Sequence, residues 1–142
     1  MTETPRHSVS VAGIVVNDEG KVLVIRRRDN GHWEPPGGVL ETSETFEEGA
    51  RREVLEETGI SVRVERLTGV YKNMKRGIVA LVFRCSPLGE PSRVTEEATE
   101  VRWMSLDEVR EVMAPAYVVR VTDAFSSSHV ITRAHDGVDL VG

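Results

Sequence analysis

The feature that most constrains this 142-residue chain is a short acidic segment, residues 41–57, which contains seven Glu and two Arg. The whole chain has a net charge of −5, so this one segment accounts for its entire acidic excess. A local cluster of carboxylates is one way in which a protein holds hard divalent cations. The balance of charge elsewhere argues against a surface for nucleic-acid polymers, which would need a basic stripe.

Residues 45–58 have the pattern of a helix. Thr45 and Glu48 have the spacing of a capping box, in which each side chain bonds the backbone N–H of the other residue. Ser43 is a second candidate for the cap. Gly59 follows the last turn, where a left-handed glycine commonly ends a helix. We therefore predict a helix from about Thr45 that ends at Gly59.

The predicted helix places carboxylates on its apolar face. At about 100° per residue, that face consists of Phe46, Ala50 and Val54. Glu53 and Glu57 lie on or beside the same face, and Glu56 lies to one side of Glu53. An isolated charge out of water costs several kcal/mol, so a buried carboxylate must be paired, hydrogen-bonded or bound to metal. The cluster therefore predicts a cation.

A purely structural interpretation of the cluster stays open. Arg52 has the four-residue spacing to pair with Glu48 and Glu56, and such pairs stabilise a helix by only a few tenths of a kcal/mol. The loop before the helix favours the metal site instead, because glycine allows close approach to the backbone. A main-chain carbonyl in the segment Pro35-Pro36-Gly37-Gly38 can complete a coordination shell made entirely of oxygen.

The rest of the chain alternates strand and helix patterns. A hairpin is expected from two apolar strands, residues 8–16 and 21–28, around a turn at residues 17–20. The other elements are expected as strands over residues 61–73, 76–85 and 99–105, as helices over 106–113, capped by Ser105, and 115–125, and as one added strand or a loose end in the tail 126–142. This order predicts one α/β or α+β domain over residues 1–142, with a mixed sheet.

Composition limits the cellular setting. No stretch approaches the roughly 18 apolar residues that a membrane span needs, and the N-terminus lacks the apolar core of a signal peptide. We therefore expect a cytoplasmic protein without a membrane partner. Cys85 is the only cysteine and stands in an apolar run, so we expect a buried structural thiol.

The segment from Gly38 to Ile60 resembles the Nudix box at every defined position. The sequence GVLETSETFEEGARREVLEETGI carries nine constrained positions at fixed spacing over 23 residues, which makes chance agreement very unlikely. The flanks are similar to MutT-like members, with Trp-Glu before Pro-Gly-Gly and a late Trp103 before a helix. Pro35 departs from the bulky apolar residue that is usual before Pro-Gly-Gly.

The resemblance implies an α/β/α sandwich with a mixed β-sheet and a loop-helix-loop catalytic motif over residues 38–60. It also implies the metal ligands, which are Glu53, Glu57 and the Gly38 carbonyl, with Glu56 as a third carboxylate or a group that orients water. The expected cation is Mg²⁺, with Mn²⁺ as the alternative.

Four further residues take roles from the same resemblance. Arg52 resembles the family arginine that orients these carboxylates, and Glu44 resembles the glutamate that ties the loop to the helix. Glu97 corresponds to an additional catalytic glutamate near the late strand, with Glu100 as its competitor. Glu56, Glu57 and Glu97 are the alternatives for the general base.

Substrate contacts are expected from the end of the second strand and from aromatic side chains. Strand alternation should direct Arg26 and Arg28 to one side and Arg27 to the other. By resemblance Arg26 is the better candidate for a phosphate contact. Trp33 and Tyr71 are candidates for stacking on a base.

The expected activity is metal-dependent hydrolysis of a diphosphate bond in a nucleotide-like small molecule. By elimination of subfamily signatures near Arg76, an NTP or modified dNTP is the leading substrate, and ADP-ribose or a nucleotide sugar is the alternative. Two other classes are a non-catalytic nucleotide sensor and an isomerase of this fold, for which a catalytic cysteine would be expected. A homodimer is expected by analogy with the fold.

Overall fold

The computed structural model describes residues 3–90, 98–126 and 129–142. Its elements in chain order are β1 (Ser8–Val15), β2 (Val22–Arg27), β3 (Trp33–Glu34), β4 (Gly37–Val39), α1 (Phe46–Thr58), β5 (Val62–Asn73), β6 (Ile78–Pro87), β7 (Ala98–Met104), α2 (Leu106–Val112), α3 (Pro115–Ser126), β8 (Ile131–His135) and β9 (Leu140–Val141).

These strands form two sheets. The larger sheet has the order β4-β1-β6-β5-β8-β9, and the smaller one has the order β3-β2-β7. In the larger sheet β1 is parallel to β6 and β5 is parallel to β8, whereas the other pairs are antiparallel. The predicted mixed sheet is therefore confirmed.

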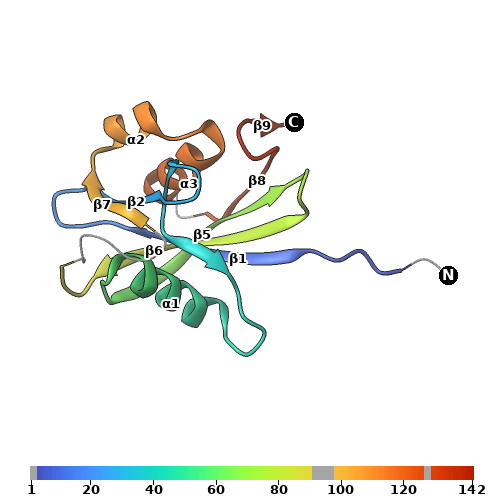
Figure 1. Cartoon of the computed structure of the whole chain (residues 1–142), viewed down its shortest axis with the longest axis horizontal. Helices are drawn as coiled ribbons and strands as arrows, with labels where there is room; N and C mark the ends of the chain where they lie inside the picture. Colours follow the sequence, from blue (N-terminus) through green and yellow to red (C-terminus); the bar gives the residue numbers. More distant parts are fainter. Residues whose placement is uncertain (1–2, 91–97, 127–128) are drawn as a thin grey trace.

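Helices cover both faces of the larger sheet (Figure 1). Side chains alternate along β1, so Val11 and Val15 pack with α1, while Ala12 and Ile14 pack in the core beneath α2 and α3. These two cores give three layers, and the predicted α/β/α sandwich is confirmed. None of the helices within the described ranges is long and apolar enough to cross a membrane.

The predicted hairpin of the first two strands is wrong. β1 pairs along its whole length with β6, from Ser8 with Ile78 to Val15 with Cys85, whereas β2 pairs with β3 and β7. One isolated bridge, between Val16 and Val22, joins the ends of the two strands. Both strands are largely buried, and their longest pairings are with the distant strands β6 and β7 rather than with each other across the local turn.

The boundaries of α1 follow the predicted caps. The Thr45 hydroxyl accepts from the Glu48 backbone N–H, the Glu48 carboxylate accepts from that of Thr45, and Gly59 has a φ of 75°. Ser105 and Glu108 form the same capping box at the start of α2. Phe46 is a correction, because its side chain is 46% exposed; the contact with the sheet begins one turn later, at Ala50.

The tail contains two strands rather than one. β8 extends the larger sheet parallel to β5, and β9 pairs antiparallel with β8. This placement buries His135, the last residue of β8, which is 1% exposed.

Candidate functional site

Two of the predicted carboxylates are buried where α1 meets the loop before it. Glu53 is 7% exposed and Glu57 is fully buried. The backbone N–H of Gly37 donates to Glu57 Oε1 at 2.6 Å. Gly38 lies directly against Glu53, because a Cβ placed on Gly38 would come within 2.6 Å of that carboxylate. The lack of a side chain at Gly38 thus leaves room for the Glu53 carboxylate, whereas Gly37 contacts Glu57 through its backbone N–H.

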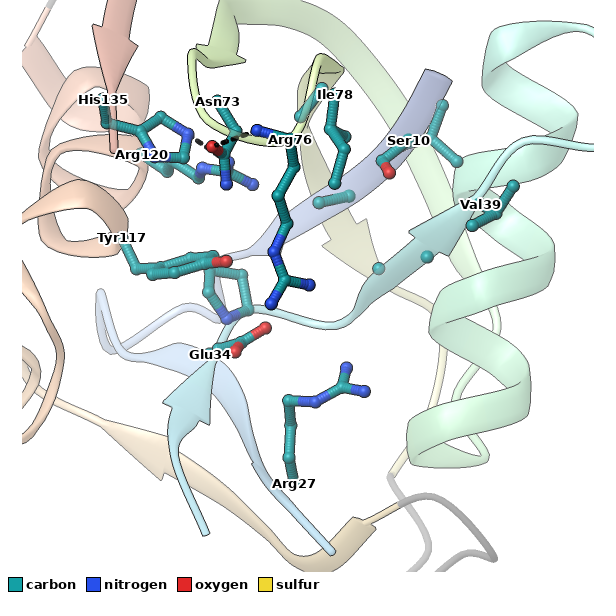
Figure 2. A pocket seen from close by; sticks show the side chains of 16 residues that line it. Ser10, Arg27, Glu34, Val39, Asn73, Arg76, Ile78, Tyr117, Arg120 and His135 are labelled. Atoms are coloured by element: carbon teal, nitrogen blue, oxygen red, sulfur yellow. Dashed lines mark hydrogen bonds between the residues drawn. The ribbon is translucent and has the colours of Figure 1, made fainter. Parts of the chain in front are cut away.

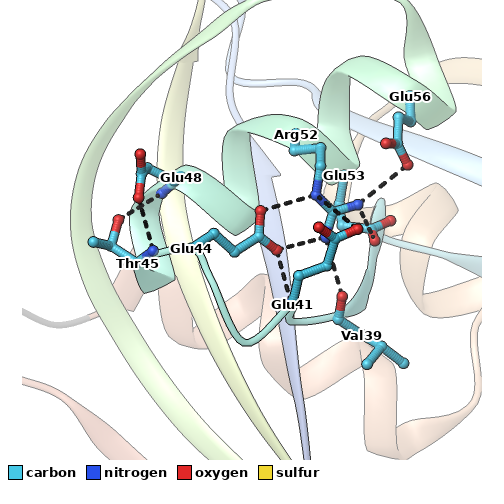
Figure 3. Close-up of polar contacts among 8 residues, drawn as sticks. All are labelled: Val39, Glu41, Glu44, Thr45, Glu48, Arg52, Glu53 and Glu56. Atoms are coloured by element: carbon cyan, nitrogen blue, oxygen red, sulfur yellow. Dashed lines mark hydrogen bonds and ion pairs between the residues drawn. The ribbon is translucent and has the colours of Figure 1, made fainter.

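Arg52 connects the carboxylates to the loop (Figure 3). Its guanidinium donates two bonds to Glu44, at 2.6 and 2.9 Å, and its Nη1 donates to Glu53 at 2.9 Å and to Glu56 at 3.2 Å. It also donates to the Val39 carbonyl at 3.1 Å. These bonds raise the pKa of Arg52 and lower the pKa of Glu44 to about 2. Arg52 thus bridges Glu44 on the loop and Glu53 and Glu56 on the helix, while the orienting role of Arg52 and the tying role of Glu44 stay predictions.

The donor set suits a hard divalent cation. Within the described ranges, no three acidic, His or Cys side chains are gathered as a preformed metal cage. Glu53 and Glu57 nevertheless present buried carboxylates beside the Gly37–Gly38 backbone, and the Glu56 side chain, 52% exposed, lies on the same helix. All the candidate ligands are oxygen atoms, which Mg²⁺ prefers. The residues therefore fit such an ion.

A cavity of about 360 Å³ begins at this loop and extends to α3 (Figure 2). One end is formed by Gly37 and Gly38, the residues that contact Glu57 and Glu53. The polar and aromatic side chains around the rest of it are Ser10, Arg27, Glu34, Asn73, Arg76, Tyr117, Arg120 and His135. Figure 2 shows Arg27 and Arg76 reaching inward from different elements, with the Glu34 carboxylate between them in this view.

Arg27 lines this cavity, and Arg26 and Arg28 do not. Arg26 donates to the Gly31 carbonyl at 3.1 Å, and Arg28 donates to the Ala98 carbonyl at 3.3 Å. Alternation along β2 does separate Arg27 from Arg26, as expected, but the cavity lies on the side of Arg27. The geometry therefore favours Arg27 over the two arginines chosen from the sequence.

The two aromatic residues expected to stack on a base, Trp33 and Tyr71, do not line this cavity either. The guanidinium groups of Arg26 and Arg102 lie over Trp33, which lines a neighbouring apolar cavity. Tyr71 is fully buried and its hydroxyl donates to Asp123 at 2.8 Å, so the expectation that it stacks on a base is wrong. Tyr117 is the aromatic side chain that lines the cavity.

Sequence reasoning missed most of the residues that line this cavity. Tyr117 and Arg120 stand three residues apart on α3, a spacing that places them on one helix face, and this was the available local signal. Arg76 is in the turn between β5 and β6, and His135 comes from the tail. These four residues meet only because the larger sheet brings β5, β6 and β8 together.

The additional catalytic glutamate keeps its status as a prediction. Glu97 lies outside the described residues. Its competitor Glu100 has a half-exposed side chain that is 3.6 Å from both Arg26 and Arg102.

Cys85 is fully buried, and burial raises its pKa to about 12. A thiol in this state is a poor nucleophile, which weighs against the isomerase alternative.

Comparison with protein-family models matches residues 6–123 to the NUDIX domain. The chain belongs to the NUDIX family. A MutT-like protein from Streptomyces ambofaciens is 57% identical over 140 residues, which cover 99% of this chain and 91% of that relative. An ADP-ribose pyrophosphatase from Methanocaldococcus jannaschii is 34% identical over 109 residues, which cover 72% of this chain and 64% of the relative.

A solved structure supports the same assignment. The crystal structure of a MutT protein from Bacillus halodurans has 26% sequence identity and a TM-score of 0.79, and the match covers 95% of each chain. The prediction of a MutT-like Nudix hydrolase is therefore confirmed, both as a family and as an enzyme class. Nudix hydrolases act on nucleoside-diphosphate-linked substrates and generally use a divalent metal.

Proposed function

We propose that this Nudix hydrolase cleaves the diphosphate bond of a nucleoside triphosphate or a modified deoxynucleoside triphosphate with the help of Mg²⁺. The observation that carries the proposal is the pair of buried carboxylates on α1, Glu53 and Glu57, which lie against Gly38 and Gly37 at one end of the cavity. Burying two negative charges on one helix face is costly, and a divalent cation bound between them would offset that cost beyond what Arg52 and the Gly37 N–H supply. A diphosphate is the ligand group that needs such a cation.

Glu53, Glu56, Glu57 and the Gly38 carbonyl would hold the ion. When bound, a divalent cation withdraws charge from phosphoryl oxygens and makes a water molecule more acidic. Arg52 holds Glu53 and Glu56 in place through one guanidinium nitrogen, so their carboxylates do not need to reorganise during turnover. Glu56 is the carboxylate of the cluster that solvent reaches most easily, which favours it as the base that accepts the proton from the attacking water.

The substrate cavity supplies the remaining contacts. The Arg27 guanidinium donates two hydrogen bonds of 3.0 Å to the Asp29 carboxylate. It is also attracted by the negative charges of Glu34 and Glu57, so the positive charge stays at the cavity wall. A fixed guanidinium there would bind phosphate oxygens and stabilise charge that develops on a leaving phosphate. The Tyr117 ring offers a surface on which a base can stack.

A second substrate is supported by a specific similarity. The Methanocaldococcus jannaschii relative is named an ADP-ribose pyrophosphatase. ADP-ribose and nucleotide sugars contain the same diphosphate, so the same carboxylates would serve, and only the groups at the far end of the cavity would distinguish these substrates. The triphosphate stays first because the sequence near Arg76 lacks the signatures expected of ADP-ribose and dinucleotide hydrolases.

The test is a product-resolved assay of wild type, Glu57→Gln and Glu47→Gln. Each protein is incubated with Mg²⁺, Mn²⁺ or EDTA and a panel of dNTPs, oxidised dGTP, ADP-ribose and nucleotide sugars, and products are identified by mass spectrometry. Because Glu57→Gln removes a charged ligand of the ion, we expect it to lose at least about 100-fold in kcat. Glu47→Gln is the matched control because Glu47 is exposed on the same helix, and it should retain activity.

Two outcomes would contradict the proposal. Unchanged hydrolysis by Glu57→Gln would exclude this carboxylate from the chemistry. A wild type that binds a nucleotide but cleaves nothing with either metal would favour the sensor alternative. Faster cleavage of ADP-ribose than of any triphosphate would retain the enzyme and replace its substrate.

A further inference from the structure

The deep end of the cavity contains a buried cation that forms no ion pair with a described carboxylate, although Glu34 acts on it electrostatically from beyond ion-pair distance. Arg120 is 8% exposed, and within the described residues it has no carboxylate within 4.0 Å and its Nε–H finds no hydrogen-bond acceptor. Its guanidinium lies over the rings of Tyr71 and Tyr117, at 5.1 and 4.7 Å from their centroids. These rings attract the charge weakly compared with an ion pair. A buried guanidinium in this state is costly, so it points to a ligand that supplies the charge.

The contact between Arg120 and His135 points the same way. The backbone N–H of Gly137 donates to His135 Nδ1 at 3.0 Å, so Nδ1 carries the lone pair and Nε2 carries the proton of the neutral ring. His135 Nε2 lies 3.4 Å from Arg120 Nη2, which is also a donor (Figure 2). Two buried donors therefore converge, and an acceptor between or beside them would satisfy both.

The surrounding charges favour an anion over a neutral acceptor. Three guanidinium groups line the cavity, on Arg27, Arg76 and Arg120, and Glu34 is the one carboxylate among the lining residues. The Glu34 carboxylate interacts electrostatically with both Arg27 and Arg120, so its single negative charge leaves the lining of the cavity positive. A carbonyl oxygen would satisfy the donors but leave the buried charge of Arg120 uncompensated.

We propose that Arg120 and His135 form a phosphate-binding subsite at the deep end of the cavity, opposite the Gly37–Gly38 end where the carboxylates lie. The phosphate is either an additional phosphoryl group carried by the substrate, away from the bond that is cleaved, or free inorganic phosphate. The proposal rests on the proposed function only in taking this cavity as the substrate cavity. The guanidinium fork and the imidazole N–H would each donate to a phosphate oxygen.

The first experiment measures binding of inorganic phosphate by isothermal titration calorimetry in EDTA, so that no metal contributes. The proteins are wild type, Arg120→Gln, His135→Phe and Arg110→Gln. Loss of a charge-assisted bond should weaken binding by about tenfold or more in the first two variants. Arg110→Gln is the matched control, because Arg110 is exposed on α2 and pairs only weakly with Asp107, and it should bind as wild type does.

The second experiment compares hydrolysis of substrate pairs that differ by one phosphate: NADP⁺ with NAD⁺, and coenzyme A with dephospho-coenzyme A. If the substrate carries the phosphate, wild type should have the higher kcat/KM for the phosphorylated member of each pair. Arg120→Gln should lose that preference while still cleaving the other member. A thermal melt of each variant confirms folding, and His135→Phe provides the test if Arg120→Gln does not fold.

The outcomes separate the possibilities. Phosphate binding that both variants weaken, without a substrate preference, supports the subsite with free phosphate as its ligand, and a preference that Arg120→Gln removes supports the substrate-borne group. Wild type without phosphate binding and without preference overturns the subsite, as does binding that neither variant alters. If wild type binds phosphate through these residues but cleaves no nucleotide, the subsite stands and the proposed function fails.

Discussion

At the scale of single residues, the site depends on Arg52. One planar guanidinium reaches the loop glutamate Glu44, the helix glutamates Glu53 and Glu56, and the Val39 carbonyl. Lysine has a single ammonium group and could not hold these acceptors in a fixed geometry. The position of the carboxylates is thus determined before any substrate arrives.

The Glu44–Arg52 pair should make stability depend on acid pH. The Glu44 carboxyl has a pKa of about 2 in the folded protein, below its ordinary value of 4.5. The ionised carboxylate therefore stabilises the fold fully above pH 4.5, and this stabilisation is lost as the pH falls from about 4.5 to about 2. Urea denaturation of wild type and Glu44→Gln from neutral pH down to about pH 3 should give two curves that converge in acid. A stability difference that stays constant over this range would contradict the assignment.

The two loop glycines should separate stability from activity. Alanine at Gly38 meets the end of the flexible Glu53 side chain, which can move, so Gly38→Ala should fold well but displace the carboxylate and lose most activity. Alanine at Gly37 meets the Val11 carbonyl oxygen at 2.5 Å and the Ala12 backbone at 2.9 Å, which cannot move easily. Gly37→Ala should therefore lower the melting temperature more than Gly38→Ala, and equal melting temperatures would contradict this explanation.

At the scale of elements, α1 holds the candidate carboxylates in a defined orientation because its caps fix both of its ends. The capping box at Thr45 sets where the helix starts, and Gly59 ends it. Because the phase of the helix follows from its start, Glu53 and Glu57 lie on the buried face with Ala50 and Val54.

Removal of the Thr45 cap tests this contribution. Thr45→Ala should reduce the free energy of unfolding by about 1 kcal/mol, because the Glu48 N–H loses its acceptor. Chemical denaturation measures the change, and Ser43→Ala, two residues before the cap, should alter stability by less than about 0.5 kcal/mol. A larger loss in Ser43→Ala would indicate that Ser43 is the cap.

At the scale of the whole molecule, α3 is attached to the larger sheet through Asp123. This residue is 3% exposed, accepts from the Tyr71 hydroxyl on β5, and receives two bonds of 2.8 Å from Arg133 on β8. The same helix carries Tyr117 and Arg120 into the cavity. The attachment therefore positions one wall of the site.

The homodimer expected from the fold stays a prediction.

Loss of that attachment should be costly. Asp123→Ala leaves the buried Tyr71 hydroxyl and the partly buried Arg133 without their acceptor, so we expect a loss of roughly 3 kcal/mol in the free energy of unfolding. The measurement is chemical denaturation, with Asp18→Ala as the control because Asp18 is exposed in a turn. A change below about 1 kcal/mol in Asp123→Ala would exclude this anchoring role.

Local sequence patterns were enough to predict α1, its two caps and the carboxylates of Glu53 and Glu57 on its buried face. These features are local, because residues a few positions apart on one helix have fixed relative positions. The residues that lie across the cavity from that helix follow from the packing of the whole chain. Strand pairing is a long-range choice, so it placed β1 beside β6 instead of β2, turned Arg27 rather than Arg26 to the cavity, and brought Arg120 and His135 together from α3 and β8. The pattern within one segment does not predict these long-range contacts, because the contacts depend on how distant segments bury their apolar faces.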